Sequence, residues 1–184
     1  MAEPMPNLLL SASTNNTVLG LLIMGKREQG ENAASGMWSN GATWLLGTII
    51  PPFQRPVVWD EERMTKFIES AWLGMHLGTF VVNNTVKVPY EDEDGNTRYH
   101  PTDLWLIDGQ QRLTAIDRYL DDRFPVFGAY WSEVTVIERR RFASTSFASS
   151  EVQLTSEPQL RDLYDRMNFG GIVHTEDQRA LPKL

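Results

Sequence analysis

The stretch LIDGQQRLTAIDRYL combines residue types that could bind an anion. Its apolar, strand-like start ends at Asp108 and Gly109. The next residues fall in the predicted first turn of a helix; they are Gln110, Gln111 and Arg112. A strand that turns at glycine into a helix directs several unpaired backbone N–H groups at one point, which favours phosphate or carboxylate. The helix dipole disfavours a cation at this end by a few tenths to ~1 kcal/mol, so the pattern predicts a negative group beside Arg112.

Two interpretations of this motif are open. In the first, the guanidinium fork of Arg112 fits phosphate oxygens, and Gln110 and Gln111 supply neutral donors and acceptors. Asp108 could hold a metal ion, orient a water molecule or fix Arg112. In the second, Asp108 and Gly109 only form a turn, and Arg112 pairs with an acidic neighbour. Short motifs often match by chance, so spacing alone leaves both in place.

A second candidate element is PPFQRP, in which three prolines stiffen the backbone around Gln54 and Arg55. An arginine on a stiff segment can bind a ligand with little loss of entropy, and Gln54 can contact a base or sugar edge. The alternative is a strand end at which Arg55 pairs with a carboxylate such as Asp60.

A third candidate is LYDRMNFGG, where a predicted helix ends in a glycine-rich turn. Arg166 and Asn168, beside Gly170 and Gly171, could complete a polyanion site. The same residues could serve only as a helix C-cap.

Composition excludes several classes of site. The 184 residues carry a net charge of -7, so a nucleic-acid contact would need a local basic patch, and the run Arg139–Arg141 is interpreted as a solvated face. The absence of cysteine removes disulfides and thiolate chemistry, and the three histidines lack metal-ligand spacing. The apolar run 17–25 is too short to span a bilayer and no basic signal start precedes it, so a cytoplasmic protein without membrane contact is expected.

Hydrophobic patterning and turn residues predict the elements that position these side chains. Residues 1–43 are expected to be an N-terminal arm or lead-in, and residues 44–184 the functional domain. The predicted strands cover 44–50, 78–82, 85–90 and 103–107, with further strands in 124–131 and 133–138. The predicted helices cover 59–74, 109–122 and 157–168, with a short one after Thr175. Residues 138–151 are predicted as a basic run followed by a serine-rich loop.

Three blocks in order, IIPPFQRPVVW, WLIDGQQRLTAI and LYDRMNFGGIVHTEDQ, resemble the domain-of-unknown-function 262 family. This is the N-terminal module of GmrSD-type and related modification-dependent restriction proteins. The resemblance covers about residues 44–180. It implies an α+β fold of the ParB/sulfiredoxin-like superfamily, with a small mixed sheet packed with helices.

The resemblance also implies a function, a Mg²⁺-dependent nucleoside triphosphatase. Catalytic roles fall on the DGQQR motif, with Asp108 as the metal ligand. The implied nucleotide-binding residues are Gln54, Arg55, Gly109, Arg112, Arg166, Asn168, Gly170 and Gly171.

Two further functions remain as alternatives. The second is a non-catalytic module that binds DNA or regulates a separate nuclease or other effector, for example in phage defence. The third, ranked last, is a stand-alone DNA endonuclease. Family members that cut DNA usually continue into an HNH-type nuclease domain, which these 184 residues do not contain.

Overall fold

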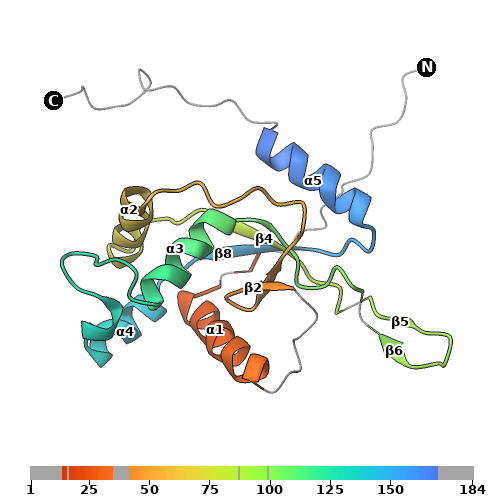
Figure 1. The fold of residues 1–184 in the computed structure, drawn as a ribbon, viewed down its shortest axis with the longest axis horizontal. Coiled ribbons are helices and arrows are strands. Elements are labelled where there is room, and N and C mark those ends of the chain that lie inside the picture. The colour runs from red at the N-terminus through yellow and green to blue at the C-terminus, as the bar shows by residue number, and fades with distance from the viewer. Residues whose placement is uncertain (1–13, 16, 35–41, 87, 99, 170–184) are drawn as a thin grey trace.

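The computed structural model describes residues 14–15, 17–34, 42–86, 88–98 and 100–169 (Figure 1). Its centre is a four-stranded sheet in the order β1-β8-β4-β7. Strands β4 and β8 are parallel, whereas β1 pairs with β8, and β7 with β4, in the antiparallel sense. The strands are β1 (Thr14–Asn15), β4 (Thr79–Asn83), β7 (Leu106–Asp108) and β8 (Ala148–Val152). A small mixed sheet packed with helices confirms the predicted α+β class.

The two faces of the sheet belong to two separate hydrophobic clusters, because consecutive strand residues point to opposite sides. Phe80 and Leu106 lie in the larger cluster, which includes side chains of four helices. Val81 and Ile107 lie in the smaller one, which packs against the fifth helix. The helices are α1 (Leu19–Ala34), α2 (Glu61–Trp72), α3 (Gln110–Leu120), α4 (Val136–Ala143) and α5 (Glu157–Phe169).

Three helices form where the sequence predicts them. Helix α2 begins after Asp60, whose Oδ1 accepts the backbone N–H of Arg63 at 2.9 Å, as expected of an N-cap. It closes at Gly74, which adopts a positive φ of 70°. Helix α3 buries Leu113 and Ile116 completely, and α5 buries Leu160 on its apolar face. The spacing of apolar residues therefore locates these helices and their buried sides.

Part of the predicted lead-in packs against the rest of the fold. Leu19 and Leu22 of α1 are buried in the larger cluster. Lys26 of α1 forms ion pairs with Asp117 and Asp121, which flank the C-terminal end of α3, at 2.5 and 3.0 Å. The domain boundary at residue 43 stays a prediction.

The predicted strand 44–50 is wrong, because the chain reverses within it. Strand β2 (Thr43–Leu45) pairs with β3 (Thr48–Ile50) through a two-residue turn. Both turn residues have positive φ, 51° at Leu46 and 84° at Gly47, which matches the twist of a tight hairpin. The hairpin leads directly into PPFQRP.

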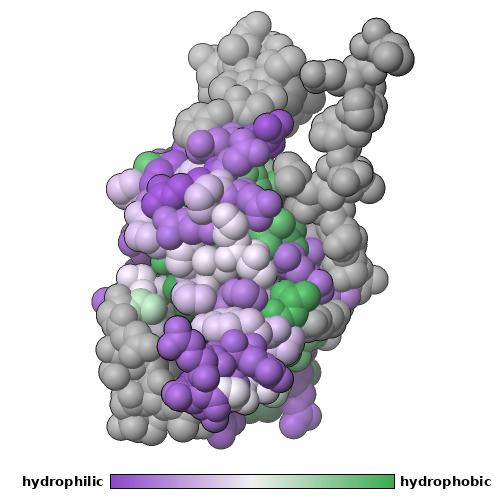
Figure 2. Space-filling model, turned by 90° about the vertical axis from the view of Figure 1, so that its right-hand side faces the viewer, coloured by the Kyte–Doolittle hydropathy of each residue, from purple (hydrophilic) through white to green (hydrophobic). Residues whose placement is uncertain are grey.

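The predicted strand 85–90 is also wrong over most of its length. Thr85 donates its backbone N–H and its hydroxyl to Asp103 Oδ1 at 2.6 and 2.9 Å, which diverts the chain from the sheet. Only a two-stranded hairpin follows, β5 (Tyr90–Glu91) with β6 (Thr97–Arg98). Figure 2 shows the end of the molecule that carries this hairpin, and its surface is mostly hydrophilic.

Residues 124–151 differ most from the predictions. The expected strand 124–131 is instead a turn, with one isolated bridge between Val126 and Ala129, and it leads into a 3-10 helix, η1 (Trp131–Glu133). The expected strand 133–138 and the loop after it become helix α4 followed by β8. Thr135 and Glu138 form a capping box that starts α4. The short helix predicted after Thr175 lies outside the described residues.

Within the described ranges, no helix combines the length and apolar character needed to cross a bilayer.

Candidate functional site

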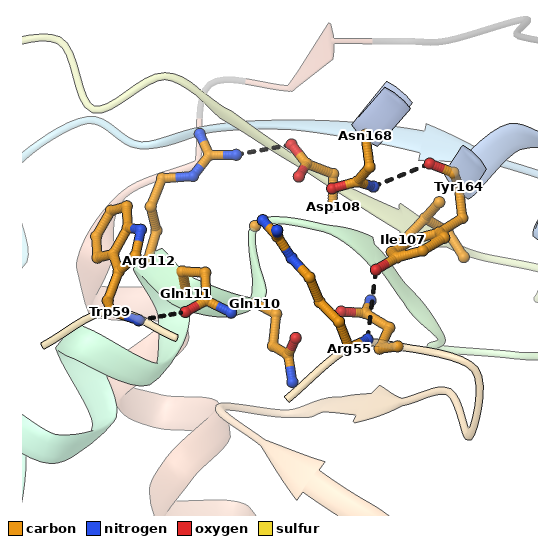
Figure 3. Close-up of a pocket in the computed structure, with 11 residues that line it drawn as sticks. Arg55, Trp59, Ile107, Asp108, Gln110, Gln111, Arg112, Tyr164 and Asn168 are labelled. Atoms are coloured by element: carbon orange, nitrogen blue, oxygen red, sulfur yellow. Dashed lines mark hydrogen bonds and ion pairs between the residues drawn. The ribbon is translucent and has the colours of Figure 1, made fainter. Parts of the chain in front are cut away.

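The DGQQR motif lines a pocket of about 170 Å³ (Figure 3). Four segments meet there: the end of β7, the first turn of α3, the segment from Gln54 to Trp59, and the C-terminal half of α5. The lining residues are Gln54, Arg55, Trp59, Ile107, Asp108, Gly109, Gln110, Gln111, Arg112, Tyr164 and Asn168. The three separate sequence blocks therefore contribute to one site.

Gly109 makes the turn that opens this pocket. Its φ is +105°, and a Cβ placed there would lie 2.6 Å from the Cβ of Phe80 on β4. Both the backbone conformation and the close approach to the sheet require glycine. As the N-cap of α3, Gly109 offers no side-chain acceptor to the first-turn N–H groups. These donors and the positive end of the helix dipole favour an anion at the mouth of the helix.

Arg112 is held at this positive helix end by Asp108. Its Nη2 donates to Asp108 Oδ2 at 2.7 Å, and its Nη1 donates to the carbonyl of Leu77 at 3.4 Å. The side chains of Arg112 and Asp108 are 19% and 32% exposed, so the pair lies partly open to the pocket. The pairing of Arg112 with an acidic neighbour, expected in one of the two interpretations, is thus present.

Arg55 provides the second guanidinium and is not neutralised in the same way. Its side chain forms no hydrogen bond or ion pair with any residue that the structure describes, and it extends into the pocket toward the Asp108–Arg112 ion pair (Figure 3). The alternative partner, Asp60, is occupied in capping α2. Two arginines against one aspartate leave the described lining with one net positive charge.

The glutamine side chains make contacts that their sequence positions do not reveal. Gln54 donates through Nε2 to the carbonyl of Leu106 on β7. Gln111 Oε1 accepts the backbone N–H groups of Val58 and Trp59 at 2.9 and 3.1 Å. The Gln110 amide, in contrast, makes no hydrogen bond within the described part of the chain.

Helix α5 closes the pocket on the side opposite α3. The Tyr164 hydroxyl accepts the backbone N–H of Arg55 at 3.4 Å, and Asn168 Nδ2 donates to the Tyr164 carbonyl at 2.9 Å. Arg166 does not line the pocket; it pairs with Asp162 at 2.9 Å on the exposed side of the helix. That hydrogen bond raises the pKa of the Arg166 guanidinium above its ordinary value. The predicted glycines, Gly170 and Gly171, lie outside the described residues.

Sequence reasoning missed two aromatic members of the site. Tyr164 follows the apolar spacing of α5, but its spacing of four from Asn168 also places both on one side of the helix. Trp59 has the spacing from Met64 of a hydrophobic staple; in the structure it contacts Phe67 edge-on, with ring centroids 5.7 Å apart. Trp59 lies four residues after Arg55, at the end of the stiff segment, and this position could have indicated that it lines the same pocket.

The lining offers an anion two guanidinium groups and the N-terminus of a helix. Small-molecule pockets typically measure roughly 300–1,000 Å³, so the described pocket, at about 170 Å³, has room for a small anionic group rather than for a whole drug-sized ligand. Asp108 is the one carboxylate among the described lining residues. Mg²⁺ is usually bound by one or two carboxylates together with substrate phosphates. Asp108 is ion-paired with Arg112, and the described residues contain no group of three or more His, Cys, Asp or Glu side chains that could hold a metal ion.

Comparison with known families gives a match over most of the chain. The family model described as GmrSD restriction endonuclease, N-terminal domain, matches residues 37–168. Comparisons with curated proteins and with solved structures gave no match.

Proposed function

The chain belongs to the family of the GmrSD restriction endonuclease N-terminal domain, and from this premise we propose that its pocket binds and hydrolyses a nucleoside triphosphate with Mg²⁺. The match covers well over half of the chain and associates it with restriction systems. It includes the DGQQR motif, PPFQRP and the part of α5 that lines the pocket.

The observation that carries the proposal is the unneutralised Arg55 guanidinium at the N-terminus of α3. Arginine pairs well with phosphate because its donors match two oxygens at once. Arg55 extends into the pocket from the segment that faces α3, toward the ion pair of Arg112 and Asp108 (Figure 3), so both guanidiniums line the pocket at the N-terminus of α3. Within the described lining, Asp108 alone opposes this positive charge.

In the proposed site, the backbone N–H groups after Gly109 and the guanidiniums of Arg112 and Arg55 bind the phosphates. Asp108 would hold Mg²⁺, which when bound supplies charge neutralisation to the phosphate oxygens. Gln110, whose amide is uncommitted, would orient the attacking water. Phosphoryl transfer depends mainly on such positioning and electrostatic stabilisation.

Phosphate release from ATP, GTP, CTP and UTP with Mg²⁺ tests the proposal. Wild type should release phosphate from at least one of them, and Asp108→Asn should reduce the rate by at least about 100-fold, as expected when a charged group of the site is removed. Binding without release in wild type would favour the rival function, a non-catalytic regulatory module. Neither binding nor release would contradict both the hydrolysis and the nucleotide site.

A separate nuclease or DNA remains the proposed partner, because the family is that of a restriction endonuclease. The Arg139–Arg141 run gives little support to a DNA patch. Arg139 donates to the carbonyl of Ser132 at 2.7 Å and lies over the ring of Trp131, and Arg141 lies over Trp72. Two of its three cations are thus engaged in packing on the protein itself.

A further inference from the structure

The side chain of Gln111 fixes the segment that carries Arg55 to α3. Gln111 Oε1 accepts two consecutive backbone N–H groups, those of Val58 and Trp59, at 2.9 and 3.1 Å. Its Nε2 donates to the carbonyl of Pro56 at 3.4 Å. Gln111 is buried, and these contacts use both acceptor positions of its oxygen and one of its two N–H donors. Little capacity remains for a ligand.

The other end of the segment is fixed to two further elements. Gln54 donates to the Leu106 carbonyl on β7, and the Tyr164 hydroxyl of α5 accepts the backbone N–H of Arg55. Arg55 therefore lies between anchors on both sides, although its own guanidinium has no partner among the described residues. A cation held in place by its backbone, with its head free, is arranged for a ligand that is yet to bind.

We propose that Gln111 is a positioning residue that acts through Arg55, and that the two glutamines of the motif have different roles. This inference rests on the proposed function of the pocket. By holding Pro56, Val58 and Trp59, Gln111 restricts the positions that Arg55 can occupy before the phosphates arrive. Ordering a long side chain and its loop on binding costs affinity, so fixing the backbone in advance strengthens binding. Gln110 is equally buried and lines the pocket, but it makes no such contact within the described residues.

A double-mutant cycle with Arg55→Ala tests this dependence, using whichever of ATP, GTP, CTP and UTP binds wild type most tightly with Mg²⁺. Gln111→Met keeps the side-chain volume but removes the hydrogen bonds, and should weaken binding about tenfold, in keeping with the loss of buried bonds. In the Arg55→Ala background the same change should have less than about a twofold effect, because residues that act together are not additive. Tyr164→Phe removes only the hydrogen bond to the backbone N–H at position 55. It should weaken triphosphate binding about threefold when Arg55 is present, and should have a smaller effect in the Arg55→Ala background.

Hydrogen exchange provides the structural control. The amides of Val58 and Trp59 should exchange faster in Gln111→Met and remain unchanged in the matched variant Gln110→Met. A thermal melt of each variant checks that it is folded at the assay temperature.

Three outcomes would overturn the inference, and they are distinguishable. If wild type binds and Gln111→Met weakens binding equally with and without Arg55, the positioning role is wrong and the proposed function stands. If the amides of Val58 and Trp59 exchange as slowly in Gln111→Met as in wild type, Gln111 does not hold this segment and the inference is wrong. If wild type binds no triphosphate, the proposed function fails and this inference fails with it.

Discussion

At the scale of single residues, the N-terminus of α3 contains an arginine where the helix dipole disfavours a cation. Asp108 offsets this cost by pairing with Arg112 at 2.7 Å, and the carbonyl of Leu77 accepts a second bond from the same guanidinium. Arg112 thus has a fixed place at the rim of the pocket before any ligand is bound. A site for phosphate needs such preorganised donors, because ordering them later would reduce affinity.

Gly78 provides the space that this placement needs. A Cβ at Gly78 would lie 2.5 Å from Arg112 Nη1, so Gly78→Ala should displace the guanidinium and weaken triphosphate binding about tenfold, the size of one charge-assisted bond. Gly74→Ala is the matched control, since Gly74 has a similar φ of +70° against +78° and nothing within 4 Å of the added Cβ. Calorimetric titration should separate the two variants; equal affinities would contradict the assignment of Gly78.

The spacing of DGQQR predicted Asp108, Gly109 and Arg112 at a helix N-terminus, and the stiff PPFQRP segment predicted Arg55; the structure places all four in the lining of one pocket. The sequence was not sufficient to separate Gln111 from Gln110. That difference depends on the path of Val58 and Trp59 past α3, which is a tertiary contact between residues more than 50 positions apart. The exclusion of Arg166 from the pocket likewise depends on how α5 is rotated against the sheet.

At the scale of elements, capping residues and helical periodicity predicted the helices better than apolar alternation predicted the strands. Helix α2 had its cap, its acidic first turn and its apolar face in the sequence. Strand β8, with the sequence ASSEV, has no apolar alternation; it is a strand because it pairs with β4 on one side and β1 on the other. Helix α4 was missed although Thr135 and Glu138 have the spacing of a capping box, because the intervening Val136 and Ile137 favoured a strand.

The capping box of α4 should make stability depend on pH. Thr135 donates its hydroxyl and its backbone N–H to Glu138 Oε2 at 2.6 and 3.0 Å, and these bonds lower the pKa of Glu138 below its ordinary 4.5. A carboxyl whose pKa is lowered on folding stabilises the fold above its unfolded pKa, and this contribution is lost as the pH falls through the folded pKa. Stability should therefore decline below pH 4.5 in part through Glu138.

Urea denaturation at neutral and acidic pH measures this contribution. Glu138→Gln keeps an acceptor for Thr135 but cannot ionise, so the variant should lose less stability than wild type on acidification. An identical loss in both proteins would show that the capping carboxylate does not contribute to the pH dependence.

At the scale of the whole molecule, the charge of the pocket opposes that of the chain. The protein carries a net charge of -7, yet the described lining of the pocket has two arginines and one aspartate. Any attraction for a polyanion is therefore local, and it should fall when one pocket arginine is removed rather than when surface cations are lost. Each charged side chain of the pocket comes from a different element. Asp108 comes from β7, Arg112 from α3, and Arg55 from the segment that Gln111 holds.

The most direct test is calorimetric titration of ATP, GTP, CTP and UTP, each with Mg²⁺, into wild type, Arg55→Ala and Arg140→Ala. Arg140 is the matched control, an exposed arginine of α4 that does not line the pocket. We expect wild type to bind at least one triphosphate. Arg55→Ala should weaken that binding by at least about tenfold, the worth of a charge-assisted contact, while Arg140→Ala stays within about twofold of wild type. No binding to wild type, or equal losses in the two arginine variants, would contradict a phosphate site at the N-terminus of α3.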